Sequence, residues 1–513
     1  MDEWVGCLEV GGVRRVAMLT GELVPDGVTE FAFPAERIFR LEMKLAGLQG
    51  EPEAKLVGLQ SEVVARGETV RLEGQRDGET FVGTCETDAG HGSIELHQVH
   101  LLSLDEYRKL STQYELADGR RISVFVNADE FIGTPTLFFA EGDRFVRIYP
   151  TAKGLFSEDG EWLELSKRAE GWIDEEVTID GPDGKLAGTL MSPPSPGPHP
   201  AVVMIHGAAG GLRDYYRAFA EQFVRNGVAA LVFDRRGWGE SEGNPQPTFG
   251  EKADDAAAWI DYLRTRPDVA KVGIWGFSNG SWVAPLVAAR DPRVAFVCVI
   301  GAAGTTALET EIHRRAFDLR GQGVPEEQVE WIREMWRMIF AADLSRLPDE
   351  QHRRRYDELA PLVAASNELQ QITLQEYAIQ VPELGPVPPW AAYGELLAEL
   401  GEPEEASDLW TLDPVDSYKV IKAPVLFLVG VDDSNLPAVE SAERVSRALE
   451  HNRESIVVLF PNTGHAMNLG RPDAIGMSDE EAGYRLHDYR FASGYLDLIE
   501  HWIRTRVTEH TVM

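Results

Sequence analysis

The sequence predicts an α/β domain, built on a mostly parallel sheet wrapped by helices, with an all-β region before it and a helical insertion within it. Three observations predict this fold class. From about residue 171 onward, almost wholly hydrophobic runs alternate with helical segments, as expected of strands covered on both faces. Before that point, short runs alternate between apolar and polar residues, which indicates antiparallel strands. Between residues 305 and 413, helical spacing replaces the alternation.

The length of the chain bears on the number of domains. A chain of 513 residues exceeds the size at which one hydrophobic core keeps growing, so two or three domains are expected. We expect a β-rich accessory region over 1–170, divisible into 1–103 and 104–170, a catalytic domain over 171–304 and 414–513, and a helical cap over 305–413.

The N-terminal β region contains several runs of alternating apolar and polar residues, separated by Gly and Asp-Gly turns. The clearest runs are 69–73, 93–97, 121–126, 136–139 and 145–149. No repeat of 40 to 50 residues is present, which disfavours a β-propeller. The role of the region stays open between positioning of the catalytic domain, contact in a homo-oligomer and carbohydrate binding.

The catalytic domain is expected to begin with a hairpin over 175–190, followed by a Pro-rich loop over 193–198. Buried strands then follow at intervals. They are predicted at 201–205, 228–233, 272–275, 294–300, 424–429 and 455–460.

The insertion carries an apolar stripe at helical spacing, formed by Val329, Ile332, Trp336, Ile339 and Phe340. A helical insertion of this length is a candidate lid that limits the size of what can bind beneath it. Its aromatic residues, Trp336 among them, either line a pocket or form the core of the insertion.

The charge of the chain restricts its partners. The 49 Lys and Arg against 84 Asp and Glu give a formal charge of −35, which repels phosphate backbones and anionic lipid surfaces. Nucleic acid is therefore not expected as a partner. No run reaches the 18 apolar residues of a membrane span, and the first residues lack the pattern of a secretory signal. We expect a cytoplasmic protein without a membrane partner.

The cysteines and histidines give no metal pattern. Cys7, Cys85 and Cys298 are sparse, which suits a reducing compartment and predicts inert core thiols. His97 and His100 lie in a stretch that resembles a strand, where a spacing of three puts side chains on opposite faces. We therefore expect no metal site.

A candidate nucleophile lies in residues 276–280, which match the pattern G-x-S-x-G with Ser278 at its centre. A serine on a sharp strand-to-helix turn needs small residues two positions before and after it, and both are Gly here. A predicted strand over 272–275 precedes the motif, and a plausible helix over 281–290 follows it.

A serine hydroxyl needs a base to activate it, and the base needs an acid to orient it. Asp433 follows the predicted strand 424–429, and His465 follows the next strand. Loops at the carboxyl ends of parallel strands collect catalytic groups. We therefore predict a triad of Ser278, Asp433 and His465, with Asp432 as the alternative acid because sequence does not define the register of a loop.

The oxyanion of a tetrahedral intermediate needs preorganised N–H donors. The backbone N–H of Asn279 is expected to be one of them. The second is expected in the Gly-rich loop 206–211, from Ala208, with Ala209 as the alternative and as a substrate contact. This loop lacks the motifs of phosphate-binding loops. The turn 234–241 follows the next strand, and its Trp238 is a candidate pocket residue.

Taken together, these motifs resemble the bacterial carboxylesterases of the α/β-hydrolase superfamily that carry a β-rich N-terminal region and a helical cap. The likeness covers about residues 175–508 and is firmest at 206–207, 234–241, 276–280, 424–433 and 464–465. The resemblance implies cleavage of a small-molecule carboxylic ester through an acyl-enzyme, without a cofactor or metal. Many members of that group have Met or Glu after the serine, so Asn279 departs from their pattern.

Other reactions use the same residues. A thioesterase, a peptidase and a non-hydrolytic or carbon–carbon-cleaving enzyme of specialised metabolism stay open as alternatives, because a fold does not define a substrate. A catalytically inactive binding module is a further alternative. The sequence does not predict the natural substrate or the oligomeric state.

Overall fold

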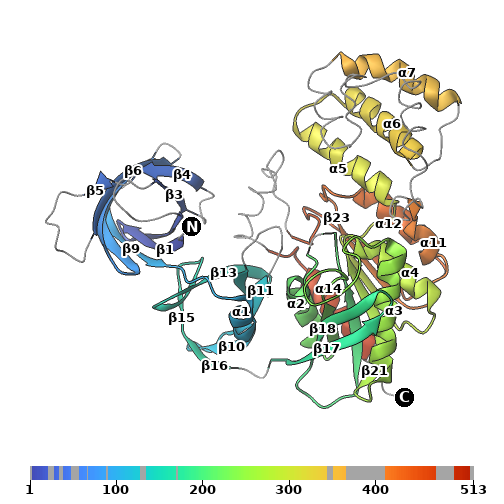
Figure 1. The fold of residues 1–513 in the computed structure, drawn as a ribbon, viewed down its shortest axis with the longest axis horizontal. Helices are drawn as coiled ribbons and strands as arrows, with labels where there is room; N and C mark the ends of the chain where they lie inside the picture. Colours follow the sequence, from blue (N-terminus) through green and yellow to red (C-terminus); the bar gives the residue numbers. More distant parts are fainter. Residues whose placement is uncertain are drawn as a thin grey trace.

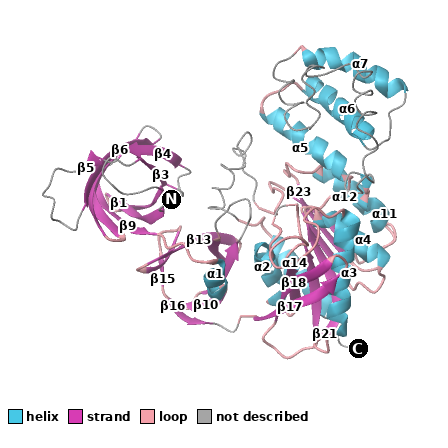
Figure 2. Ribbon diagram, in the orientation of Figure 1, coloured by secondary structure: helices cyan, strands magenta, loops and turns pink. Residues whose placement is uncertain are grey.

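The structure is a computed structural model with three sheets along the chain and a group of helices beyond the third (Figure 1). It describes residues 3–20, 28–33, 38–44, 46–47, 57–65, 68–87, 90–127, 135–168, 171–208, 210–343, 350–365, 411–468 and 490–508. Strands dominate the N-terminal part, and helices gather around the third sheet and in the insertion (Figure 2).

The first sheet is antiparallel and has nine strands in the order β4-β3-β2-β1-β9-β8-β7-β6-β5. Its strands are β1 (Glu3–Val10), β2 (Val13–Thr20), β3 (Val28–Phe33), β4 (Ile38–Lys44), β5 (Ala46–Gly47), β6 (Val57–Ala65), β7 (Glu68–Asp77), β8 (Thr80–Thr87) and β9 (Gly90–Gln98). One face buries apolar residues such as Trp4, Leu8 and Leu96. This is the sheet expected from the alternating pattern.

The second sheet follows helix α1 (Leu104–Leu110) and is also antiparallel. Its order is β15-β14-β13-β12-β11-β10-β16. The strands are β10 (Thr112–Leu116), β11 (Arg121–Asn127), β12 (Thr136–Glu141), β13 (Arg144–Thr151), β14 (Gly154–Ser157), β15 (Trp162–Leu163) and β16 (Leu165–Arg168). A bridge between Val99 and Thr151 joins the end of β9 to this sheet.

The third sheet has eight strands in the order β17-β18-β20-β19-β21-β22-β23-β24. They are β17 (Ile173–Gly181), β18 (Gly184–Ser192), β19 (His199–Ile205), β20 (Ala229–Phe233), β21 (Val269–Phe277), β22 (Val297–Ile300), β23 (Val425–Gly430) and β24 (Ile456–Phe460). The hairpin β17–β18 is antiparallel, and β18 pairs antiparallel with β20, whereas all pairs from β20 to β24 are parallel. The predicted hairpin and the six predicted strands are confirmed. Strands β19 to β23 are buried over most of their length, as expected, whereas β24 lies at the edge of the sheet and is only half-buried.

Helices cover both faces of the third sheet. One face carries α3 (Phe249–Thr265), α4 (Gly280–Arg290), α11 (Pro414–Tyr418) and α12 (Ala438–Ala448), whose apolar side chains join the first of its two cores. The other carries η2 (Arg213–Tyr216), α2 (Arg217–Val224), α14 (Tyr495–Trp502) and η5 (Ile503–Thr508), which form the second.

The insertion lies between β22 and β23 and contains α5 (Ala307–Gly321), α6 (Glu326–Asp343) and α7 (Glu350–Ala364). These helices stand beyond the edge of the third sheet in Figure 1 and share a core of their own. Trp336 belongs to this core, is 1% exposed and has the guanidinium of Arg315 over its ring. Among the described residues, Trp336 therefore packs the insertion itself.

The three cysteines are unpaired, and burial raises the pKa of each thiol. Cys85 and Cys298 are buried, while Cys7 is half-buried. Within the described ranges, every helix is too short or too polar to cross a membrane.

Candidate active site

Ser278 lies on a sharp turn between β21 and α4, with a φ of 50°, in the left-handed region that side chains rarely adopt. The turn is held because the Ser278 N–H donates to the Ile300 carbonyl at 3.1 Å. A Cβ on Gly276 would lie 2.3 Å from the Gly280 carbonyl oxygen, and one on Gly280 would lie 2.6 Å from the Ile205 oxygen. Only glycine fits at these two positions, so the motif has a steric basis.

His465 is paired with Asp433 at the carboxyl ends of β24 and β23. The His465 Nδ1 lies 2.8 Å from Asp433 Oδ2, and the Asp433 side chain is fully buried. The other carboxylate oxygen accepts the backbone N–H groups of Asn435 and Leu436, at 2.8 and 3.2 Å. Since an ionised carboxylate only accepts, Nδ1 carries the proton and Nε2 is left to act as a base.

Asp432, the alternative acid, has a different position. Its side chain is exposed, and its backbone N–H donates to the Thr463 carbonyl at 3.0 Å. The structure therefore brings Asp433, rather than Asp432, to His465.

Gly301 connects Ser278 to the histidine. It follows Ile300, which accepts the Ser278 N–H, and a Cβ on it would lie 2.5 Å from the His465 carbonyl oxygen and 3.2 Å from its Nδ1. The ring of Phe277, which precedes the serine, lies 5.2 Å from the His465 ring. Ser278, Asp433 and His465 thus gather at one edge of the sheet.

The loop after β19 reaches the same edge. The imidazole of His206 is buried and donates from Nε2 to the Phe233 carbonyl. Burial lowers the pKa of His206 to about 3, so the ring is neutral. The Gly207 N–H donates to the Tyr216 hydroxyl at 2.7 Å and is therefore occupied.

Ala208 follows Gly207 and is exposed. Its carbonyl accepts from Arg235 Nη1 at 2.9 Å, which pins the loop. Ala209, the alternative donor and expected substrate contact, lies outside the described residues. The predicted oxyanion donors Asn279 and Ala208 thus come from the turn after β21 and the loop after β19.

Two further side chains, Lys252 and Trp238, contact the turn of Ser278 and the loop after β19. Lys252 Nζ of α3 donates to the side-chain oxygen of Asn279, so the amide beside Ser278 has a cationic partner. Trp238 packs on the loop, because a Cβ on Gly211 would meet its ring at 2.8 Å, and the Arg235 guanidinium lies 5.0 Å from the ring centroid. Trp238 therefore supports the loop from the side.

Two family models match parts of the insertion and of the third sheet with its helices, which we call the hydrolase region from here on. A model described as serine aminopeptidase, S33, matches residues 196–371, and one described as BAAT / acyl-CoA thioester hydrolase C terminal matches residues 405–470. The first spans the strand, turn and helix around Ser278, and the second spans Asp433 and His465. The chain belongs to the α/β-hydrolase superfamily.

Several curated proteins resemble part of the chain. The quorum-quenching protein AidA of Acinetobacter baumannii is 40% identical over 126 residues, which are 24% of this chain and 41% of that protein. The thiohydrolase apmlB of Arthrinium phaeospermum is 32% identical over 133 residues, 25% of this chain and 43% of that protein. The esterase EstD of Thermotoga maritima is 27% identical over 139 residues, which are 25% of this chain and 32% of that protein. The chain spans about two fifths of the length of the first two.

A solved structure resembles a larger share of the chain. An esterase of Pyrococcus furiosus is 16% identical with a TM-score of 0.37, covering 65% of this chain and 91% of that one.

Several residues of this α/β-hydrolase site could not be found from the sequence pattern. Lys252 lies on an ordinary helical stretch, and nothing in its spacing points to Asn279. His313 of α5 donates from Nε2 to the Asp433 carbonyl at 3.4 Å, and burial lowers its pKa. Gly301 had a usable signal, because it directly follows a predicted buried strand in the position where catalytic loops begin.

Proposed function

We propose that this α/β-hydrolase cleaves carboxylic esters with a triad of Ser278, His465 and Asp433. The observation that carries the proposal is the 2.8 Å pair between His465 Nδ1 and buried Asp433, at the same sheet edge as the strained turn of Ser278. A serine on a strained turn, backed by an imidazole that a carboxylate orients, is the arrangement that makes an alcohol nucleophilic.

The reaction follows from these positions. The Ser278 Oγ attacks the ester carbonyl carbon while His465 Nε2 takes the hydroxyl proton. The N–H groups of Asn279 and Ala208 receive the oxyanion, each donor being worth about 10²–10³ in rate. The imidazolium then gives its proton to the departing alcohol, and water hydrolyses the acyl-enzyme by the same steps.

Thioesters are the second candidate substrates. The match of residues 405–470 to an acyl-CoA thioester hydrolase model and the likeness to a thiohydrolase favour them. The triad attacks both carbonyls in the same way, so the discrimination depends on the leaving group and its binding site. A panel of p-nitrophenyl esters and acyl-CoA substrates separates the two.

Labelling with a fluorophosphonate probe tests the nucleophile. The wild type should be labelled, and Ser278→Ala should not, because the phosphonate bonds to the activated hydroxyl. Ser278→Ala and His465→Ala should each lower kcat for p-nitrophenyl acetate by several orders of magnitude. An unlabelled wild type that also lacks activity on every ester and thioester would refute the proposal.

The acid has a matched control in its neighbour. Asp433→Asn should lower kcat by about 10⁴, since an amide can leave His465 in the wrong tautomer. Asp432→Asn changes an exposed carboxylate and should stay within a factor of about two. The reverse order of effects would assign the acid to Asp432.

A further inference from the structure

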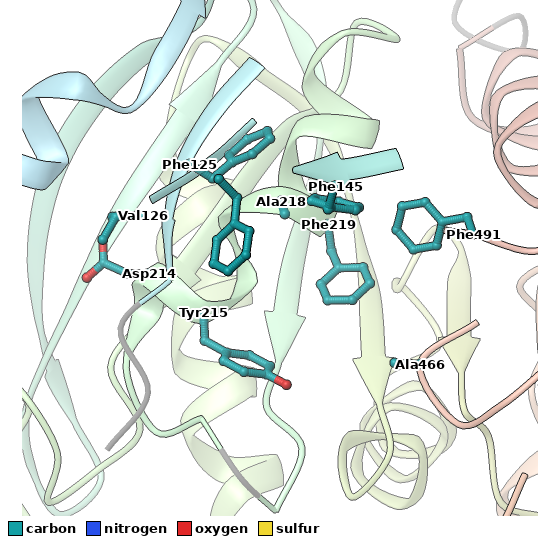
Figure 3. A pocket seen from close by; sticks show the side chains of 10 residues that line it. Phe125, Val126, Phe145, Asp214, Tyr215, Ala218, Phe219, Ala466 and Phe491 are labelled. Carbon is teal, nitrogen blue, oxygen red and sulfur yellow. The ribbon is translucent and has the colours of Figure 1, made fainter. Parts of the chain in front are cut away.

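An apolar pocket lies between the second sheet and the hydrolase region (Figure 3). It is a partly open hollow, and the empty space within and in front of it amounts to about 620 Å³. Six aromatic side chains from the two parts of the chain line it: Phe125, Phe138, Phe145, Tyr215, Phe219 and Phe491. Concave apolar sites of this kind are where proteins bind small organic ligands.

The pocket wall is linked to His465 and Ser278 through their chain neighbours. Its lining residue Ala466 directly follows His465. The ring of Phe219 stacks at 5.9 Å on Phe277, the residue before Ser278. The pocket wall therefore includes the chain neighbour of His465 and a residue that packs on the chain neighbour of Ser278.

The pocket also adjoins the oxyanion loop. Its lining residue Tyr215 lies against Gly210, where a Cβ would come within 2.7 Å of the ring. Gly210 follows Ala208 by two residues, so the same ring that bounds the pocket also supports the loop. Among the described residues, no lining residue comes from α5, α6 or α7.

The one acidic side chain of the wall is neutralised. Asp214 is 1% exposed, and its carboxylate accepts Arg108 Nη2 at 2.7 Å and Nε at 3.2 Å. A charged ligand group would find no free opposite charge among the described lining residues, so the chemistry of the wall suits a neutral apolar group.

We propose that this pocket binds the neutral apolar part of the ester, so that the second sheet forms half of the specificity site. The proposal rests on the ester hydrolysis argued above. Either the acyl group or the alcohol of the substrate supplies this part, and the two sources share the same chemistry. The second sheet then has a direct part in substrate selection.

Filling and enlarging the pocket tests this. Ala218 lines it from α2, and Ala218→Phe should lower kcat/KM for large esters relative to p-nitrophenyl acetate by at least tenfold, as loss of methylene-sized space does. Phe145→Ala should shift the ratio the other way. One series varies the acyl chain of p-nitrophenyl esters from acetate to octanoate, and the other varies the alcohol of acetate esters from ethyl to naphthyl. The series that responds identifies the bound part.

Ala257→Phe is the matched control, because Ala257 is exposed on α3, and its ratios should equal those of the wild type. Labelling of each variant by the fluorophosphonate probe verifies that the site is assembled. If Ala218→Phe fails to fold, Phe145→Ala alone decides. Ratios within twofold of the wild type in both series, with labelling intact, would overturn the pocket and leave the hydrolase. A wild type that is neither labelled nor active on any ester or thioester would instead overturn the hydrolase.

Discussion

Three glycines allow the close backbone contacts on which the geometry of this site depends. Gly276 and Gly280 allow the backbone of the turn to close around Ser278, and Gly301 allows the strand β22 to end against His465. In each case the nearest atoms to an added Cβ include backbone carbonyls, which cannot move aside as a flexible side chain can. The positions of the three proposed triad residues therefore depend on backbone approach as much as on their own contacts.

Gly301→Ala should separate His465 from Asp433. Gly301 has a φ of 51°, and the added Cβ would lie 2.5 Å from the His465 carbonyl oxygen, so the loop after β24 must shift. A misplacement of about 1 Å costs on the order of 100-fold in rate, and we expect a fall in kcat of that size. The measurement is kcat on p-nitrophenyl acetate.

Gly323→Ala is the matched control for backbone strain. Gly323 also has a positive φ of 81°, but a Cβ on it meets nothing within 4 Å. Its kcat should stay within about twofold of the wild type. Equal activity of the two variants would show that the contact at Gly301 is not needed.

At the scale of elements, the strands β19 to β23 of the third sheet could be predicted because each contains a hydrophobic run that is buried on both faces. The loops that follow β21, β23 and β24 could be predicted to meet, because parallel strands end at one edge. Which of Asp432 and Asp433 contacts His465 could not be predicted, since only the folded loop defines which carboxylate turns inward.

The sequence pattern could not predict the contacts between elements that are distant along the chain. Alternation along β11 indicates which side chains project from each face of the strand, but not which surface packs against that face. The packing of Phe125 and Phe145 across a pocket from Phe219 depends on how the second sheet docks. Likewise the apolar stripe with Trp336 correctly indicates a helix but does not separate a core residue from a pocket residue.

The loop between β19 and η2 should be sensitive to acid. His206 has a pKa of about 3 in the folded protein against about 6.5 in an unfolded chain, so below pH 6.5 the unfolded state binds more protons. Its contribution to stability is complete above pH 6.5 and is lost as the pH falls toward 3, by at most about 1.4 kcal/mol per pH unit. Thermal unfolding of the wild type and of His206→Asn, at pH 7, 5.5 and 4, measures this.

The difference between the two proteins should shrink as the pH falls, because asparagine does not titrate. At pH 7 the variant should be the less stable of the two, since it loses the buried ring and its contacts with Tyr216 and Phe233. A difference in midpoint that stays constant from pH 7 to pH 4 would mean that His206 does not cause the acid sensitivity.

At the scale of the whole molecule, buried polar contacts hold the second sheet against the hydrolase region. Glu221 of α2 accepts the Ser123 hydroxyl at 3.0 Å, and burial raises the pKa of this carboxyl. Arg108 of α1 reaches across to Asp214 of η2. Because the proposed pocket lies between the same two parts, these contacts bear on substrate selection as well as on stability.

Arg108→Ala should loosen this interface. It leaves the Asp214 carboxylate buried without its partner, which we expect to lower stability by about 2–3 kcal/mol, somewhat less than for a fully buried pair because the Arg108 side chain is 33% exposed. The unpaired charge also faces the apolar pocket, so kcat/KM should fall more for large esters than for p-nitrophenyl acetate. Thermal unfolding and the ester series measure the two effects.

The double variant Arg108→Ala, Asp214→Asn should recover part of the lost stability and part of the lost kcat/KM for large esters. It removes the carboxylate charge that the single variant leaves without a partner. Arg447→Ala breaks an exposed pair with Glu443 on α12 and should change stability by less than about 1 kcal/mol. If Arg108→Ala behaves like Arg447→Ala, the ion pair does not hold the second sheet in place. The pocket would then depend on the packing of its aromatic residues alone.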